Sequence, residues 1–190
     1  ALIHILTLRA LSPFELVNWT TYLLLSLFPL SIYWSMRRIG FDQLSSAMGG
    51  LVASLTATDG LYGFDFKSYV WRGYGIYPQL WAMVLMPPAL AICYRVLREG
   101  RGYFWATLLL AATLMSHLIY GFIVFLPLSV LTFLPMTRLL TSEFPRVIWM
   151  RWKRLLILLV MVVVVTSYFL VPLTLDQPYL NLSVLEDPRL

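Results

Sequence analysis

The stretch LLILLVMVVVVTSYFLV at positions 155–171 contains no charged side chain and decides the class of fold. A helix needs about 20 consecutive, predominantly apolar residues to cross the hydrocarbon core of a bilayer. Arg151, Lys153 and Arg154 come just before this run. Basic residues often flank membrane spans in this way. The stretch therefore predicts a transmembrane helix over residues 155–171.

The composition of the whole chain supports the same class. Of its 190 residues, 60% are hydrophobic and 12% are charged, with a mean hydropathy of +0.79. A soluble domain carries about a quarter charged residues, and the long apolar runs differ from the alternating pattern of a β-barrel. The net charge of +5 does not indicate nucleic acid, because the basic residues lie at the ends of apolar runs. We therefore expect an all-α, polytopic transmembrane helix bundle whose partner is the lipid bilayer.

Local signals divide the chain into about six helices, which form a single transmembrane domain over residues 1–190. Ser12 and Glu15 form a capping box at the first helix, and Asp42 can cap the second. The second helix carries small residues at a spacing of four, among them Gly50, which favours close packing of helices in lipid. The predicted helices are 14–36, 44–58, 78–97, 103–119, 121–137 and 155–171.

Two of these boundaries depend on length. Residues 104–137 form an apolar stretch that is too long for one span of about 20 residues, so we divide it near Tyr120-Gly121.

With the first helix running inward, ten of the fourteen basic residues then lie on the inner side. We expect a multi-pass protein of the cell membrane with both termini outside. Because the chain opens without Met and closes in a polar stretch, we also expect a fragment of a larger membrane protein.

The loop after the second helix is the first candidate site. Asp59 and Asp65 supply two carboxylates, and Lys67 and Arg72 supply two cations. Paired carboxylates can bind a divalent cation or act as acid and base, and an arginine can bind a phosphate through two hydrogen bonds. The alternative is an ordinary interfacial loop with an aromatic belt and local ion pairs.

His117 is the second candidate, because an ionisable side chain at membrane depth is a functional candidate by default. The alternative is a histidine that bonds to a neighbouring helix. Gln79, with Tyr77 two residues earlier, lies at the mouth of the third helix, where both are candidates for substrate binding. The alternative, which the residue type favours, is that Gln79 forms a structural hydrogen bond across helices. We predict that Asp59 or Asp65, Arg72 and His117 line one pocket at the outer mouth of the bundle.

Several short motifs occur in an order that resembles the GT-C-like superfamily of multi-pass membrane glycosyltransferases. They are RRIG at 37–40, GYGIYPQL at 73–80, PPALA at 87–91 and TLMSH at 113–117 followed by YG at 120–121. More narrowly, residues 11–137 resemble a bacterial membrane domain labelled "6-pyruvoyl-tetrahydropterin synthase-related". That label does not imply the activity of the soluble synthase, which uses three histidines to bind zinc, whereas this chain has only His4 and His117.

The resemblance implies a polyprenyl-phosphate-linked sugar donor used at the outer membrane face. It also implies a main catalytic acid in a first outer loop, which we expect to lie before the start of this fragment. Asp59, Asp65 and His117 would then be secondary catalytic residues, while Arg72, Gln79 and Tyr77 would bind substrate. A divalent cation is the expected cofactor if the carboxylates bind a metal. The alternatives are a transporter or flippase module for lipid-linked glycans, and a structural membrane subunit.

Overall fold

The chain is all-helical over the residues that the computed structural model describes, which are 12–54, 77–133 and 144–176. In chain order the helices are α2 (Pro13–Ile39), α3 (Gln43–Ser54), α5 (Tyr77–Glu99), α6 (Tyr103–Ser116), α7 (Leu118–Ile123), α8 (Phe125–Leu131) and α9 (Phe144–Leu175). α7 and α8 form one apolar segment that is interrupted at Val124. Pro127 explains the interruption, because it has no N–H to donate to the carbonyl of Ile123. The prediction of an all-α bundle of about six helices is therefore confirmed.

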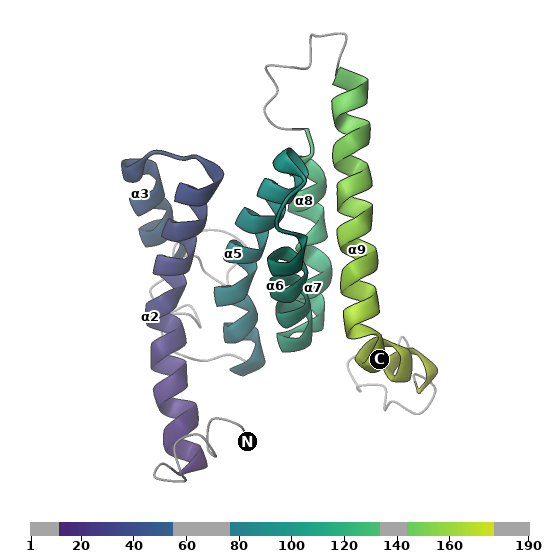
Figure 1. The fold of residues 1–190 in the computed structure, drawn as a ribbon. Helices are drawn as coiled ribbons and strands as arrows, with labels where there is room; N and C mark the ends of the chain where they lie inside the picture. Colours follow the sequence, from purple (N-terminus) through teal and green to yellow (C-terminus); the bar gives the residue numbers. More distant parts are fainter. Residues whose placement is uncertain (1–11, 55–76, 134–143, 177–190) are drawn as a thin grey trace, which may run out of the picture.

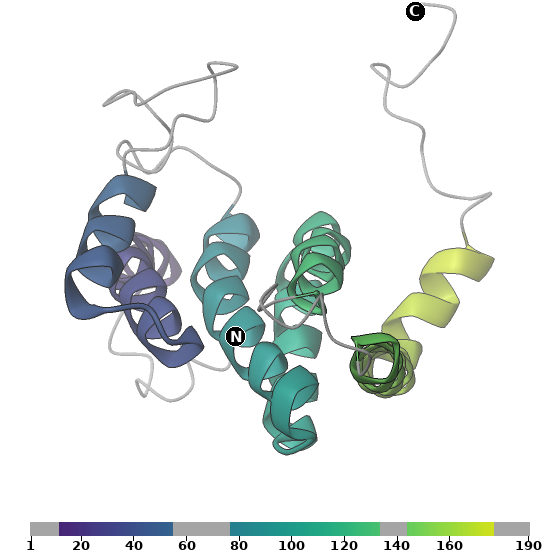
Figure 2. The same cartoon turned by 90° about the horizontal axis from the view of Figure 1, so that it is seen from above.

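α5 is the central helix of the bundle. It contacts α2 on one side and α6, α7, α8 and α9 on the other (Figure 1). Seen from above, the helices form a curved row with α2 and α3 at one end and α9 at the other (Figure 2). α2, α5 and α9 are long and apolar enough to cross a membrane. α2 and α9 also expose many large apolar side chains, which a bilayer solvates and water does not.

The ends of α2 follow the signals in the sequence. The backbone N–H of Glu15 donates to Ser12 Oγ at 3.2 Å, and the N–H of Ser12 donates to the Glu15 carboxylate at 2.8 Å. Gly40 ends the helix at φ 119°, a left-handed conformation that favours glycine. Asp42 then accepts hydrogen bonds from the hydroxyl and the N–H of Ser45, and these bonds lower the pKa of the Asp42 carboxyl. The predicted caps of the first two helices are thus both present.

α3 packs against α2 through the small residues that the sequence singled out. Ser46 and Gly50 are both buried. A Cβ atom on Gly50 would lie 2.8 Å from the carbonyl oxygen of Pro29, so the two backbones approach too closely for any larger residue. α3 ends at Ser54 within the described residues, and residues 55–58 of the predicted helix lie outside them.

Two prolines interrupt the hydrogen-bond ladder of α5, and α2 compensates for one of them. Pro88 has no N–H, so the carbonyl of Val84 lacks its usual donor within the helix. The hydroxyl of Ser31 in α2 donates to this carbonyl instead, at 2.6 Å. A backbone group freed by proline in lipid needs such a partner from a neighbouring helix. Ser31 therefore links α2 to α5 at the point where the ladder of α5 is broken.

α6 and α7–α8 form a helical hairpin that turns at His117 (Figure 1). The backbone of His117 is extended, with φ −156° and ψ 113°, and this ends α6 before α7 begins. The prediction of a break at Tyr120-Gly121 is therefore wrong. Gly121 serves close packing within the hairpin, because a Cβ atom there would lie 2.6 Å from Leu114 Cα. The predicted helix 103–119 is Tyr103–Ser116, and the predicted helix 121–137 begins instead at Leu118. Residues 134–137 of that prediction lie outside the described part of the chain.

α9 begins at Phe144 and ends at Leu175, so the predicted bounds of 155–171 are too narrow. The prediction stopped at the basic residues because charged side chains avoid lipid. The helix continues through them because the arginines have partners at the ends of other helices. Arg151 donates to the carbonyl of Thr132 after α8, at 2.8 Å. Arg154 donates to the carbonyls of Leu97 and Arg98, at 2.8 and 2.9 Å. Arginines at helix C-termini satisfy carbonyls that have no partner within their own helix.

Candidate functional site

Three of the predicted site residues lie outside the described part of the chain. They are Asp59, Asp65 and Arg72, which fall within residues 55–76. Their roles, and the pocket that they were expected to share with His117, stay predictions. Among the described residues, no three histidine, cysteine, aspartate or glutamate side chains come together as ligands for a metal ion.

The other three predicted site residues lie at the same end of the bundle. Tyr77 and Gln79 are in the first turn of α5, and His117 is at the turn of the hairpin. Gln79 Nε2 donates to the hydroxyl of Tyr120 at 3.2 Å. The ring of His117 packs edge-on against the ring of Tyr120, with centroids 5.2 Å apart and an interplanar angle of 85°. Tyr120 thus connects two residues that the sequence left separate, and we name Tyr77, Gln79, His117 and Tyr120 the polar cluster.

His117 is the most unusual member of the polar cluster. Its backbone N–H donates to the carbonyl of Thr113 at 3.0 Å and so completes the last turn of α6. Its Nδ1 atom is buried but has no hydrogen-bond partner among the described residues. A buried polar atom without a partner is costly, and such atoms are rare in folded proteins. Since an imidazole nitrogen can donate or accept, His117 has an unused bonding capacity within the bundle.

Tyr77 holds the start of α5 against α2. Its hydroxyl shares a hydrogen bond with Thr20 Oγ1 at 2.8 Å. Its ring packs edge-on against Trp81 in the next turn, with centroids 6.4 Å apart. Tyr77 and Tyr120 both lie against an apolar cluster that includes the buried Leu24. This packing holds both phenol rings in place, with their hydroxyl groups beside the apolar cluster around Leu24.

Sequence reasoning missed Tyr120 and Thr20. Tyr120 was read as part of a helix break, although it lies one turn after His117 and faces back towards it. Thr20 looks like any hydroxyl in an apolar helix, because its Oγ1 also donates to the carbonyl of Leu16 at 2.6 Å. Their partners are 41 and 57 residues away along the chain, and no local pattern carries that information.

The polar cluster lies far from the arginines. Gln79 and Arg98 are both in α5, separated by about 28 Å of helix rise. The end of the bundle that carries the final turns of α2 and α5 is named the basic end, and it holds Arg37, Arg38, Arg95, Arg98 and Arg101.

Comparison of the chain with protein-family models, with curated proteins and with solved structures finds no match in any of the three. The chemistry of the two ends is therefore the basis for assigning a function.

Proposed function

We propose that this chain is part of a GT-C-like membrane glycosyltransferase, or of a close relative, that handles a polyprenyl-phosphate-linked sugar. The observation that carries the proposal is the buried, unpartnered Nδ1 of His117 beside the Gln79–Tyr120 hydrogen bond. A sugar presents hydroxyl groups, and a phosphate presents acceptor oxygens. Either group can form hydrogen bonds with a histidine, an amide and a phenol that lie together at one end of a helix bundle.

The charge distribution indicates which membrane face this site would occupy. Positively charged segments of membrane proteins remain on the cytoplasmic side. We place the protein in the inner membrane with its basic end in the cytoplasm. The polar cluster then lies in the outer leaflet. A polyprenyl-phosphate sugar exposed on that leaflet would present its phosphate and its sugar at this depth. The resemblance to GT-C-like enzymes supports the same substrate class.

The proposed roles follow from residue chemistry. His117 would bond a hydroxyl or phosphate oxygen through Nδ1, and Gln79 would orient it through Tyr120. Asp59 and Asp65 would bind the acceptor or a divalent cation, and Arg72 would bind the donor phosphate.

The test uses the intact protein in proteoliposomes with a radiolabelled polyprenyl-phosphate hexose. The readout is release of the sugar from its lipid. Asp59→Asn, Asp65→Asn and His117→Ala should each reduce turnover by about a hundredfold, as expected when acid–base or positioning groups are removed. Tyr22→Phe is the matched control, because Tyr22 is an exposed residue of α2 outside the polar cluster. Parental turnover in all three site variants would refute the enzymatic proposal.

A second candidate function is transport or flipping of a lipid-linked glycan. Interrupted helices favour it, because transporters often build binding sites at such breaks. In this chain the α7–α8 segment is interrupted at Val124. The same proteoliposomes separate the two functions, since a flippase makes the labelled lipid accessible from the opposite face with its sugar still attached. A structural subunit would show neither activity.

A further inference from the structure

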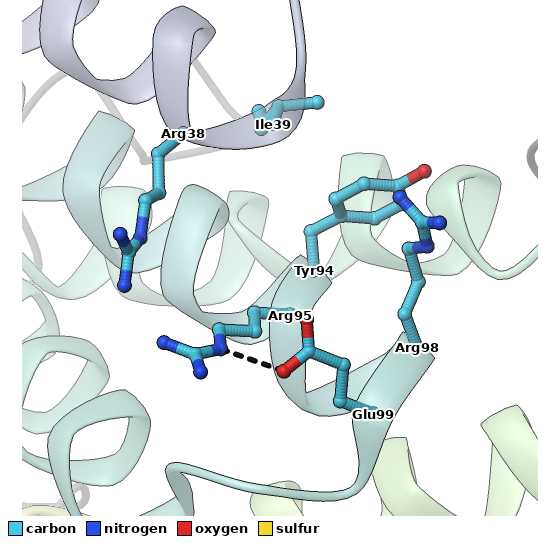
Figure 3. Close-up of a pocket in the computed structure, with 6 residues that line it drawn as sticks. All are labelled: Arg38, Ile39, Tyr94, Arg95, Arg98 and Glu99. Carbon is cyan, nitrogen blue, oxygen red and sulfur yellow. Dashed lines mark hydrogen bonds and ion pairs between the residues drawn. The ribbon is translucent and has the colours of Figure 1, made fainter.

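A polar cavity lies at the basic end, between the last turns of α2 and α5 (Figure 3). Its volume is about 250 Å³, and it is lined by Arg38, Ile39, Tyr94, Arg95, Arg98 and Glu99. Three of these six side chains are guanidinium groups, and one is a carboxylate. The cavity is separate from the polar cluster, and the inference drawn from it does not depend on the proposed function.

The charges that line the cavity do not cancel. Arg95 Nε lies 2.8 Å from Glu99 Oε2, and this is the ion pair that forms within the described residues. Figure 3 shows Arg38 reaching down from α2 beside Arg95, while Arg98 extends along the other wall. Arg38 and Arg98 are left without a carboxylate partner in the described part of the chain. The cavity therefore holds an excess of positive charge.

Arg98 is held in place by its surroundings. Its guanidinium lies 5.6 Å from the centre of the Tyr94 ring, and Tyr94 is only 8% exposed. Its carbonyl oxygen accepts a hydrogen bond from Arg154 of α9, which fixes the backbone at this position. A cation over an aromatic ring is favourable, and it leaves the N–H groups at the edge of the guanidinium able to donate. Arg98 is thus oriented before any ligand arrives.

Exposed aromatic side chains place this end of the bundle at the level of lipid headgroups. Trp34 and Phe41 are 45% and 49% exposed on either side of the final turn of α2. Phe104 and Trp105 are 67% and 59% exposed at the start of α6. Aromatic residues gather where the hydrocarbon core meets water, and basic residues lie just beyond them. A ligand in the cavity would therefore have its charge beside the headgroup layer.

We propose that this cavity binds the phosphate ester of an anionic phospholipid headgroup in the adjacent leaflet. Guanidinium groups suit phosphate, because their paired N–H donors match two phosphate oxygens. Basic pockets between transmembrane helices at the cytoplasmic side bind anionic headgroups in this manner. Arg38 and Arg98 bind the phosphate from two different helices. Glu99 opposes binding, because it repels the phosphate and occupies Arg95.

The test measures lipid binding to the full chain, purified in a neutral detergent, by native mass spectrometry. The probe is phosphatidylglycerol, with phosphatidylcholine as the neutral lipid. Arg38→Gln and Arg98→Gln should each raise the apparent Kd for phosphatidylglycerol about tenfold, which is typical for loss of one charge-assisted hydrogen bond. Arg101→Gln is the matched control, because Arg101 is exposed at the same end but does not line the cavity. Its Kd should stay within about twofold of the parent, since exposed charges contribute little.

Glu99→Gln should change the affinity in the opposite direction. It should lower the Kd for phosphatidylglycerol severalfold, because it removes a repulsive charge and releases Arg95. A misfolded variant cannot produce this gain. Equal weakening by Arg101→Gln and Arg38→Gln would mean general attraction to a basic surface, and would overturn the site. Weaker binding by Glu99→Gln would overturn it as well. Competition by inorganic phosphate at the lipid's own concentration would assign the cavity to a soluble anion and overturn the headgroup assignment.

Discussion

Replacing Ser31 with alanine should destabilise the bundle in a manner that depends on a proline in a different helix. The Ser31 hydroxyl donates to the carbonyl of Val84 at 2.6 Å, and Pro88 is the reason that this carbonyl needs a donor. Both Ser31 and Val84 are partly buried, so water has little access to the freed oxygen. Loss of the bond should cost about 1 to 3 kcal/mol, the usual cost of a buried acceptor left without a partner.

The double variant gives the sharper result. Pro88→Ala restores a backbone N–H that can donate to the carbonyl of Val84 within α5. In the Pro88→Ala background, Ser31→Ala should therefore cost little, and the two changes should couple by about 1 kcal/mol or more. Ser26→Ala is the matched control, because Ser26 is exposed and donates within its own helix to Tyr22, at 2.9 Å.

The assay is equilibrium unfolding of the purified chain in mixed micelles with increasing denaturing detergent. The free energies of unfolding of the four chains, from parent to double variant, give the coupling. If Ser31→Ala costs the same with Pro88 and with Ala at that position, the hydroxyl does not compensate for the proline. A loss equal to that of Ser26→Ala would refute the reasoning in the same way.

Three further predictions concern packing, the anchoring of α9 and orientation. Gly50→Ala should destabilise the bundle measurably and Gly50→Leu by about 1 to 3 kcal/mol or more, because any Cβ atom meets the backbone of α2; two variants that unfold like the parent would contradict this contact. Arg154→Gln should cost about 1 to 3 kcal/mol in the same assay, because two carbonyls at the end of α5 lose a charged donor, whereas exposed Lys153→Gln should be near neutral. In whole cells, cysteine at position Asp176 should react with an impermeant maleimide and cysteine at Met150 should not; labelling of the latter alone would reverse the orientation.

The fold was predictable where a local pattern determines the structure. The capping box at Ser12 and the cap at Asp42 each depend on neighbours within a few residues. Boundaries failed where distant contacts decide them. Gly121 has the composition of a helix break, but its position against Leu114 in the other arm of the hairpin requires a small residue within a helix. The hairpin turn was therefore assigned to the wrong residue.

Distant contacts also decide where α9 begins. Charged residues normally end an apolar span, and Leu155 does begin the uncharged part of this helix. The helix extends further because Arg151 and Arg154 satisfy carbonyls on α8 and α5, which the sequence of α9 does not reveal. For the candidate site, the sequence identified Gln79 and His117 by their polarity in apolar surroundings. It could not identify the phenol between them, because a tyrosine near a membrane interface is unremarkable by itself.

The length of the hairpin has a consequence for the membrane around it. α6 has 14 residues and a rise of about 21 Å, whereas the hydrocarbon core of a bilayer is about 30 Å thick. Hydrophobic mismatch of this kind is relieved by thinning of the adjacent bilayer, at a fraction of a kcal/mol per Å. We expect the leaflet beside Ile119 and Phe122, both exposed on the hairpin, to dip towards the basic end. A charged headgroup in that depression would approach His117 without crossing a full thickness of hydrocarbon.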